Sequence, residues 1–236
     1  MTSFIVPAHN EEAWVGRCVS AIHGELESLD EPHEVIVVDD ASSDATASVA
    51  QQQGAQVIRV EHRQISATRN AGAWQAQGDI LFFVDADTLV NAAAMQSALH
   101  SVRAGAVGGG CVPRFEGWLP WWCRPTLLVG ERLCRWLRIF PSGACLFCTR
   151  SAFQAAGGFN ENYYALEDAV FVHALKRQGR FVIIAETVVT SGRKFRAHSF
   201  LSIAGLFTRM VLRGSSGFRS RRGLDYWYKP EREKAK

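Results

Sequence analysis

The stretch Ile80-Leu-Phe-Phe-Val-Asp-Ala-Asp-Thr88 places two carboxylates directly after five consecutive apolar residues. An apolar run of this length, bounded by Gly78, is typical of a strand buried on both faces of a sheet. In open α/β sheets, ligands bind beyond the carboxyl ends of the strands. Asp85 and Asp87 are therefore candidate ligands for Mg²⁺ or Mn²⁺, which bind through one or two carboxylates together with substrate phosphates. The alternative is that both residues cap the helix that follows.

Length and composition fit one domain with a full core, alone or with a small appendage, because 47% of the 236 residues are hydrophobic. A formal net charge of +3 is too small to indicate a nucleic-acid partner. The first residues lack the pattern of a secretory signal, and no uncharged apolar run reaches the roughly 18 residues of a membrane-spanning helix. We expect a cytoplasmic protein that can touch the inner face of the cell membrane without crossing it.

The six cysteines show no spacing that indicates a disulfide framework. Cys145 and Cys148 form a Cys-x-x-Cys pair inside an apolar run, without a second pair or a nearby histidine. We interpret them as core thiols rather than as a metal or redox site. The other four are Cys18, Cys111, Cys123 and Cys134.

Strands and helices alternate along the chain, which predicts an α/β fold with a mostly parallel central sheet and helices on both faces. The expected strands cover residues 3–6, 34–38, 56–60, 80–84, 143–149 and 181–189. The expected helices cover the residues up to 29, then 46–53, 66–77, 91–102, and two segments that begin at Ser151 and Glu167.

The turn after the first strand reads Pro7-Ala-His-Asn-Glu-Glu12, which contains no glycine. A dinucleotide-binding turn would need Gly-x-Gly-x-x-Gly at this point, and a P-loop would need Gly-x-x-x-x-Gly-Lys-Ser/Thr. Glycine amides therefore do not cradle phosphates here. A metal ion at Asp85 and Asp87 is the available group to neutralise them.

Two segments of the second half could meet a membrane. Tryptophans and arginines alternate from Trp118 to Arg138, a composition typical of an interfacial helix, of a cap over a cleft, or of ordinary core packing. Residues 187–224 contain no acidic side chain and many basic ones. Such a run can solvate a surface, meet anionic lipid or face a phosphate-bearing ligand. The apolar stretch 200–212 could form a helix on the membrane or on the core.

Four stretches in this order resemble the family 2 glycosyltransferases of the GT-A fold. The stretches are Phe4-Ile-Val-Pro-Ala-His-Asn-Glu-Glu12, Val35-Ile-Val-Val-Asp-Asp-Ala-Ser-Ser-Asp44, Arg69-Asn-Ala-Gly-x-x-x-Ala-x-Gly-Asp79 with Asp85-Ala-Asp87, and Glu167-Asp168. The resemblance implies a catalytic domain over residues 1–190, with a nucleotide-binding half (1–105) and an acceptor half (106–190). Residues 191–236 would form a basic, amphipathic extension that packs on this domain or on a membrane.

The resemblance also implies a metal-dependent, inverting transfer of a sugar from a UDP- or GDP-sugar to a hydroxyl acceptor, which could be a lipid. Asp87 would hold Mn²⁺ or Mg²⁺, with Asp85 nearer the ribose or the water shell of the metal. Asp168 would be the general base. Further contacts to the nucleotide sugar would come from Pro7, His9, Glu11, Asp40, Arg69 and Ala86. Second-tier candidates are Glu167 beside the base, and Arg193 and His198 as a later phosphate or metal contact.

Other classes of function stay open at this point. The helix dipole favours Glu167 and Asp168 in a first turn without any catalytic role. Nucleotidyl transfer would need a glycine-rich, lysine-bearing loop after the first strand, which this chain lacks. A non-catalytic nucleotide- or membrane-binding module would not need four unpaired carboxylates at one place, which we expect from Asp40, Asp85, Asp87 and Asp168. The Gln-x-x-Arg-Trp motif of processive polysaccharide synthases is absent, and His9 stands where tyrosine is commoner.

Overall fold

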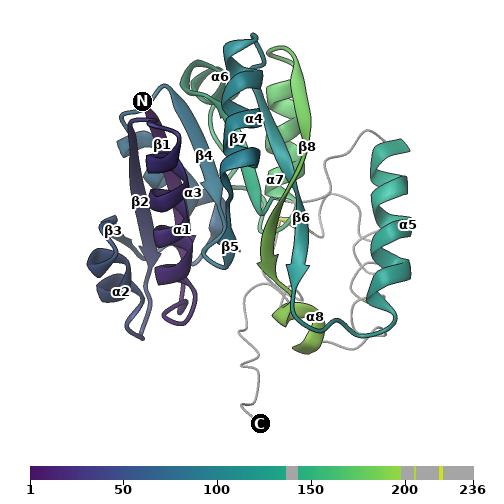
Figure 1. Cartoon of the computed structure of the whole chain (residues 1–236), viewed down its shortest axis with the longest axis horizontal. Helices are drawn as coiled ribbons and strands as arrows, with labels where there is room; N and C mark the ends of the chain where they lie inside the picture. Colours follow the sequence, from purple (N-terminus) through teal and green to yellow (C-terminus); the bar gives the residue numbers. More distant parts are fainter. Residues whose placement is uncertain (137–142, 198–204, 206–217, 220–236) are drawn as a thin grey trace.

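The computed structural model describes residues 1–136, 143–197, 205 and 218–219 (Figure 1). The described strands form one sheet in the order β3-β2-β1-β4-β7-β6-β8-β5. The strands are β1 (Thr2–Ala8), β2 (His33–Asp40), β3 (Gln56–Val60), β4 (Ile80–Val84), β5 (Thr88–Leu89), β6 (Gly108–Glu116), β7 (Cys145–Thr149) and β8 (Phe181–Ser191). The helices are α1 (Val15–Ser28), α2 (Thr46–Gln52), α3 (Ile65–Gln75), α4 (Ala92–Arg103), α5 (Cys123–Trp136), α6 (Arg150–Ala156), α7 (Glu167–Lys176) and α8 (Arg193–Ala197).

The sheet has a parallel half and a mixed half. β1 pairs in parallel with β2 and with β4, and β2 pairs in parallel with β3. β7 then runs antiparallel to both β4 and β6, while β6 and β8 are parallel and β5 is antiparallel to β8. The parallel half therefore carries the carboxyl ends of β1, β2, β3 and β4 at one edge, as expected of a ligand-binding α/β sheet.

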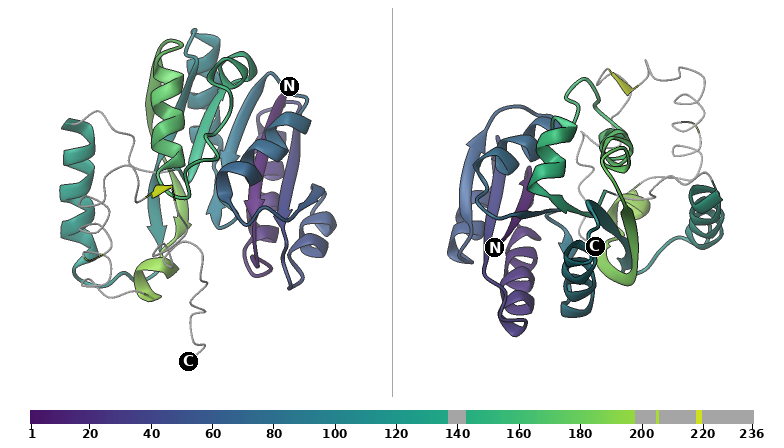
Figure 2. Two further views of the ribbon diagram at one scale, coloured as in Figure 1. Left: turned by 180° about the vertical axis from the view of Figure 1, so that it is seen from behind. Right: turned by 90° about the horizontal axis from the view of Figure 1, so that it is seen from above.

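Helices cover both faces of the sheet, which confirms the sequence-based prediction (Figure 2, right). Strand β4 shows the two faces: Phe82 and Val84 join one core with α1, α2 and α4, while Leu81 and Phe83 join a second core with α3, α6 and α7. All four side chains are fully buried. Burial on both faces explains why this strand is a continuous apolar run rather than an alternating one.

Strand β6 departs from the sequence-based expectation because three glycines and a proline disfavour a strand. A Cβ atom at Gly109 would lie 2.3 Å from the ring of Phe147 and 2.5 Å from the carbonyl oxygen of Val182. Glycine is therefore required for β6 to approach β7 and β8 this closely. This segment, which was not among the expected strands, is a centre of backbone packing.

The core-thiol interpretation of Cys145 and Cys148 is confirmed, because both are buried and free. Cys18, Cys111 and Cys123 are buried and free as well, whereas the side chain of Cys134 lies outside the described residues. Cys145 packs in the core on the α1 side of the sheet and Cys148 in the core on the α3 side. Residues three apart on a strand point to opposite faces. The Cys-x-x-Cys pair therefore cannot act as one metal or redox site.

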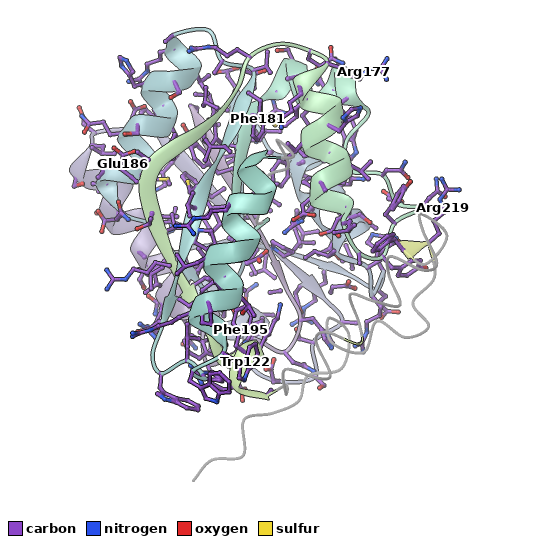
Figure 3. The ribbon with its side chains drawn as sticks, turned by 90° about the vertical axis from the view of Figure 1, so that its right-hand side faces the viewer. Trp122, Arg177, Phe181, Glu186, Phe195 and Arg219 are labelled. Atoms are coloured by element: carbon purple, nitrogen blue, oxygen red, sulfur yellow. The ribbon has the colours of Figure 1, made fainter. Side chains whose placement is uncertain are left out.

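The tryptophan- and arginine-rich stretch forms a loop followed by α5, which stands at the edge of the molecule (Figure 1). Trp118 and Trp121 are 71% and 85% exposed. Trp122 instead lies beside Phe195, with ring centroids 6.4 Å apart (Figure 3). Among the described residues, no helix is long and apolar enough to cross a bilayer. The helix expected over 200–212 has only residue 205 within the described part of the chain.

Candidate active site

Three loops meet at the carboxyl edge of the parallel strands. Asn10, after β1, donates its backbone N–H to Ser42 Oγ (2.9 Å) and accepts from the backbone N–H of Ser43 through Oδ1 (2.8 Å), so the first loop is tied to the loop after β2. Asn10, Ala41 and Arg63 have φ angles of 56°, 54° and 51°. Side chains disfavour this left-handed region, and such strain clusters at functional sites.

Asp40 joins the end of β2 to the start of α3. Its carboxylate accepts from the backbone N–H groups of Arg63 (2.8 Å) and Gln64 (3.1 Å) and from the hydroxyl of Thr68 (2.8 Å). These donors fix the loop that leads into α3. The predicted contact between Asp40 and a nucleobase would have to use the remaining acceptor capacity of the same two oxygens, and it stays a prediction.

His9 lies on the same edge, with Nδ1 2.8 Å from the carbonyl oxygen of Asp40 and Nε2 2.7 Å from a guanidinium nitrogen of Arg63. Arg63 is exposed and was not among the sequence-based candidates, although it immediately precedes a predicted helix that follows a strand end. Pro7 lies within β1, in register with Val38. Ala86 packs into the core, so only its backbone could meet a ligand.

Arg69 is the central buried cation of the site. Its guanidinium donates to Asp85 Oδ1 (2.9 Å), to Glu167 Oε1 (3.0 Å) and to the carbonyl oxygen of Gly143 (3.2 Å). One side chain of α3 therefore ties the turn after β4 to the first turn of α7. The guanidinium of Arg69 is therefore engaged by Asp85 and Glu167. The predicted contact of Arg69 with the nucleotide stays a prediction.

Asp87 and Glu11 share a second arginine. Arg193 Nη2 lies 3.2 Å from Asp87 Oδ2 and also donates to Glu11 Oε1, while Thr190 Oγ1 lies 3.4 Å from Asp87 Oδ1. Burial raises the pKa of both carboxyl groups; Arg193 opposes the rise at Glu11, and Lys194 followed by Arg193 opposes it at Asp87. Glu11 Oε2 is buried and has no hydrogen-bond partner in the part of the chain that the structure describes. These contacts bring Glu11, Asp87 and Arg193 together across 182 positions of sequence.

Asp85 and Asp87 do not cap the following helix. The N-cap of α4 is Asn91, whose Oδ1 accepts from the backbone N–H of Ala94 at 2.9 Å. The expectation of four unpaired carboxylates is wrong for Asp40, which has three donors, and for Asp85 and Asp87, which each pair with an arginine. The paired charges lower the cost of burying acidic groups at one edge of the sheet.

Asp168 is the second residue of α7, whose N-cap Leu166 again has a left-handed φ, of 59°. Its Oδ1 accepts from the backbone N–H of Ala169 (2.7 Å), and no group in the described ranges donates to Oδ2. Burial raises the pKa of Asp168, and burial also raises that of Glu167 to about 7. Glu167 is bound to Arg69, whereas Asp168 Oδ2 has no donor among the described residues and could take part in proton transfer.

The residues on this edge suit a hard divalent cation. Three carboxylates offer oxygen atoms here, the ligand type that Mg²⁺ and Mn²⁺ prefer. They are Asp85 through Oδ2, Asp87, and Glu11 through Oε2. Within the described ranges, no three acidic, histidine or cysteine side chains are close enough to enclose a metal ion by themselves. These carboxylates therefore suit an ion that is held jointly by the protein and a phosphate-bearing ligand. His198, the other metal candidate, lies outside the described residues.

A groove of about 1100 Å³ lies between α5 and the ends of β6 and β8. Arg114 and Arg124 supply cations to its lining, and Glu116, which pairs with Arg17, supplies a carboxylate. It reaches Val189, the residue before Thr190, whose hydroxyl contacts Asp87. Its apolar lining comprises Phe115, Trp118, Leu119, Trp121, Leu127, Leu128 and Val189.

Comparison with known proteins finds glycosyltransferases that are similar over part of this chain. A dolichyl-phosphate beta-glucosyltransferase of Drosophila melanogaster is 39% identical over 100 residues, which are 36% of this chain and 30% of that protein. An undecaprenyl-phosphate 4-deoxy-4-formamido-L-arabinose transferase of Serratia proteamaculans is 34% identical over 93 residues, 36% of this chain and 28% of that protein. The chain spans between 25% and 30% of the length of the curated relatives it matches.

The fold is that of solved GT-A glycosyltransferases. Glucosyl-3-phosphoglycerate synthase from Mycobacterium tuberculosis, crystallised with Mn²⁺, UDP and phosphoglyceric acid, superposes with a TM-score of 0.58 at 19% identity. The match covers 90% of this chain and 76% of that one. Residues 3–157 match Glycosyl transferase family 2. The chain belongs to this family.

Proposed function

We propose that the protein transfers a sugar from a nucleoside diphosphate sugar, with UDP or GDP as the nucleotide, to a hydroxyl acceptor. The observation that carries this proposal is the joining of two acidic turns through Arg69. Its guanidinium holds Asp85 at the end of β4 and Glu167, the neighbour of Asp168, at the start of α7. A group that binds a donor and a group that accepts a proton are thereby held on one rigid support.

In this proposal Asp87 and Asp85 hold Mn²⁺ or Mg²⁺, with Glu11 beside them. The bound ion would stabilise the negative charge that develops on the leaving diphosphate. Asp168 takes the proton of the acceptor hydroxyl while that oxygen bonds to the anomeric carbon and the bond from this carbon to the phosphate oxygen breaks. One in-line displacement inverts the anomeric centre. Burial, which raises the pKa of Asp168, makes its carboxylate a stronger base.

The relatives named after polyprenyl phosphates raise a second possibility for the acceptor. A phosphate acceptor is already anionic near neutral pH, so it would need no base and would be repelled by Asp168. Asp168 Oδ2, which accepts from no group in the described ranges, therefore favours a hydroxyl acceptor. The two acceptor classes differ in a measurable way, because only transfer to a hydroxyl should depend strongly on this carboxylate.

We propose further that the acceptor is linked to a lipid, whose apolar chain lies in the groove beside α5 and whose anionic group meets Arg114 and Arg124. The support is chemical: an apolar lining, two cations, and the exposed rings of Trp118 and Trp121, as found at membrane interfaces. Residues 1–105 and 106–190 would then be donor and acceptor halves. Residues 191–236 would assist peripheral contact at the cytoplasmic face of the membrane.

Farnesyl phosphate is a suitable probe of this groove, with quenching of tryptophan fluorescence as the readout. We expect it to bind, and we expect Trp118→Ala and Arg124→Ala to weaken that binding about tenfold each. Trp74→Ala is the matched control, because Trp74 is 54% exposed on α3, outside the groove. Equal binding by all these variants, or equal binding of inorganic phosphate, would contradict a lipid groove.

A thermal-shift screen tests the donor site itself. UDP, GDP, CDP and dTDP are each added with Mn²⁺ or with EDTA to the full chain. We expect one nucleotide to raise Tm only when the metal is present, because ligands that bind the folded state stabilise it. No shift with any nucleotide, in protein shown to be folded, would contradict the proposal. Binding without any transfer would favour the non-catalytic class.

A further inference from the structure

Arg193 occupies an unusual position for a basic residue at a proposed metal site. It is the first residue of α8, directly after β8, and its side chain is 24% exposed. Its guanidinium reaches back to Asp87 and Glu11, and it lies 5.6 Å from the ring centroid of Trp14. The contacts with Trp14 and the two carboxylates give the cation a defined resting place.

Two cations favour the charged form of Asp87, Lys194 and, after it, Arg193. Arg193 is the one in direct contact with this carboxylate among the described residues, at 3.2 Å. Arg69, which is fully buried, is committed to Asp85 and Glu167. A divalent cation at Asp87 would therefore meet a guanidinium bonded to the same carboxylate, and two like charges at such a distance repel each other strongly in a partly buried site.

Resting on the proposed function, we infer that Arg193 exchanges partners during donor binding. It neutralises Asp87 in the ligand-free protein, gives up this carboxylate to the metal, and then contacts the diphosphate that arrives with the metal. A guanidinium matches phosphate oxygens with two parallel hydrogen bonds, so it suits both partners. Glu11, which also holds Arg193, remains beside the site as a pivot for this small movement.

The exchange couples metal binding to nucleotide binding. Metal alone must displace Arg193 without offering it another anion, so it binds weakly. Metal with a nucleoside diphosphate supplies that anion, so the two bind tightly together. A permanent ion pair between Arg193 and Asp87 would give no such coupling, because the arginine would stay on the carboxylate in both states.

Titration of Mn²⁺, followed by its electron paramagnetic resonance signal, tests this inference without reference to activity. The full chain is compared with Arg193→Gln, with and without UDP. We expect Arg193→Gln to bind Mn²⁺ alone about tenfold more tightly than the wild type. We expect it to bind Mn²⁺ with UDP about tenfold less tightly, within the usual range of coupling between sites.

Arg17→Gln is the matched control. Arg17 also lies 5.6 Å from the ring centroid of Trp14 and pairs with a glutamate, Glu116, but neither contact involves Asp87. We expect its Mn²⁺ affinity to equal that of the wild type. Arg193→Lys keeps the charge without the planar fork, so it should bind Mn²⁺ alone as weakly as the wild type and lose UDP affinity. Arg193→Lys also tests the inference if Arg193→Gln fails to fold.

Unchanged or weaker binding of Mn²⁺ alone by folded Arg193→Gln would overturn the exchange, even if its UDP affinity falls. That pattern would leave Arg193 as a phosphate contact only, with the proposed function intact. Failure of all the proteins to bind Mn²⁺, with or without UDP, would overturn the proposed function and this inference together.

Discussion

The turns after β2 and β4 carry the same kind of sequence but hold their charges differently. Both strands flank β1; β2 ends in Asp39 and Asp40, and β4 is followed by Asp85 and Asp87. Asp40 is satisfied by two backbone N–H groups and a nearby hydroxyl. Asp85 and Asp87 are instead satisfied by the long side chains of Arg69 and Arg193.

This difference separates a structural turn from a turn that can exchange ligands. Backbone donors cannot leave a carboxylate without unfolding the loop, because their positions are set by the chain. An arginine side chain can rotate away from a carboxylate at a smaller cost. Acidic residues that look alike in sequence can thus have opposite roles, and the type of donor distinguishes them.

The largest effect should follow Asp87→Asn. We expect transfer to fall about a thousandfold, since removal of one group that stabilises transition-state charge typically costs 10² to 10³ in rate. The free energy of unfolding should stay the same or rise, because burial disfavours the charged form of Asp87. Steady-state kinetics and urea denaturation measure the two quantities. Asp79→Asn, at an exposed carboxylate, is the control that should change neither.

Asp40→Ala should show the reverse pattern. Loss of its three hydrogen bonds leaves the buried N–H of Gln64 without a partner, so we expect the free energy of unfolding to fall by about 3 kcal/mol. Asp39→Ala is the comparison within the same turn. Asp39 accepts one hydrogen bond, from the backbone N–H of Ser42. Its replacement should therefore lower the free energy of unfolding by only about 1 kcal/mol. Equal stability of the two variants in urea would contradict a structural role for Asp40.

A smaller effect should appear in the pH dependence of stability. Burial raises the pKa of Glu167 from 4.5 to about 7, so the folded state holds its proton more tightly than the unfolded state between these values. The stabilising contribution is complete below pH 4.5 and is lost as pH rises towards 7. We therefore expect the free energy of unfolding to fall steadily over this range. In Glu167→Gln this slope should be reduced; an unchanged slope would assign it to other groups.

The parallel half of the fold could be predicted from sequence because buried parallel strands leave continuous apolar runs, as at Ile80–Val84. Strand β6 could not, because its glycines are explained only by the close approach of Phe147. The acidic members of the site were also predictable from their places after strands. Their partners were not: Arg193 contacts Glu11 across 182 positions, and no local pattern encodes such a pairing.

The most direct test of the central claim is the rate of sugar transfer by Asp168→Asn, with the donor nucleotide identified by thermal shift. We predict that the variant binds this nucleotide with metal as tightly as the wild type, while transfer to a hydroxyl acceptor falls 10² to 10⁴-fold. Transfer at the wild-type rate would show that Asp168 is not the base and would contradict the account of this site.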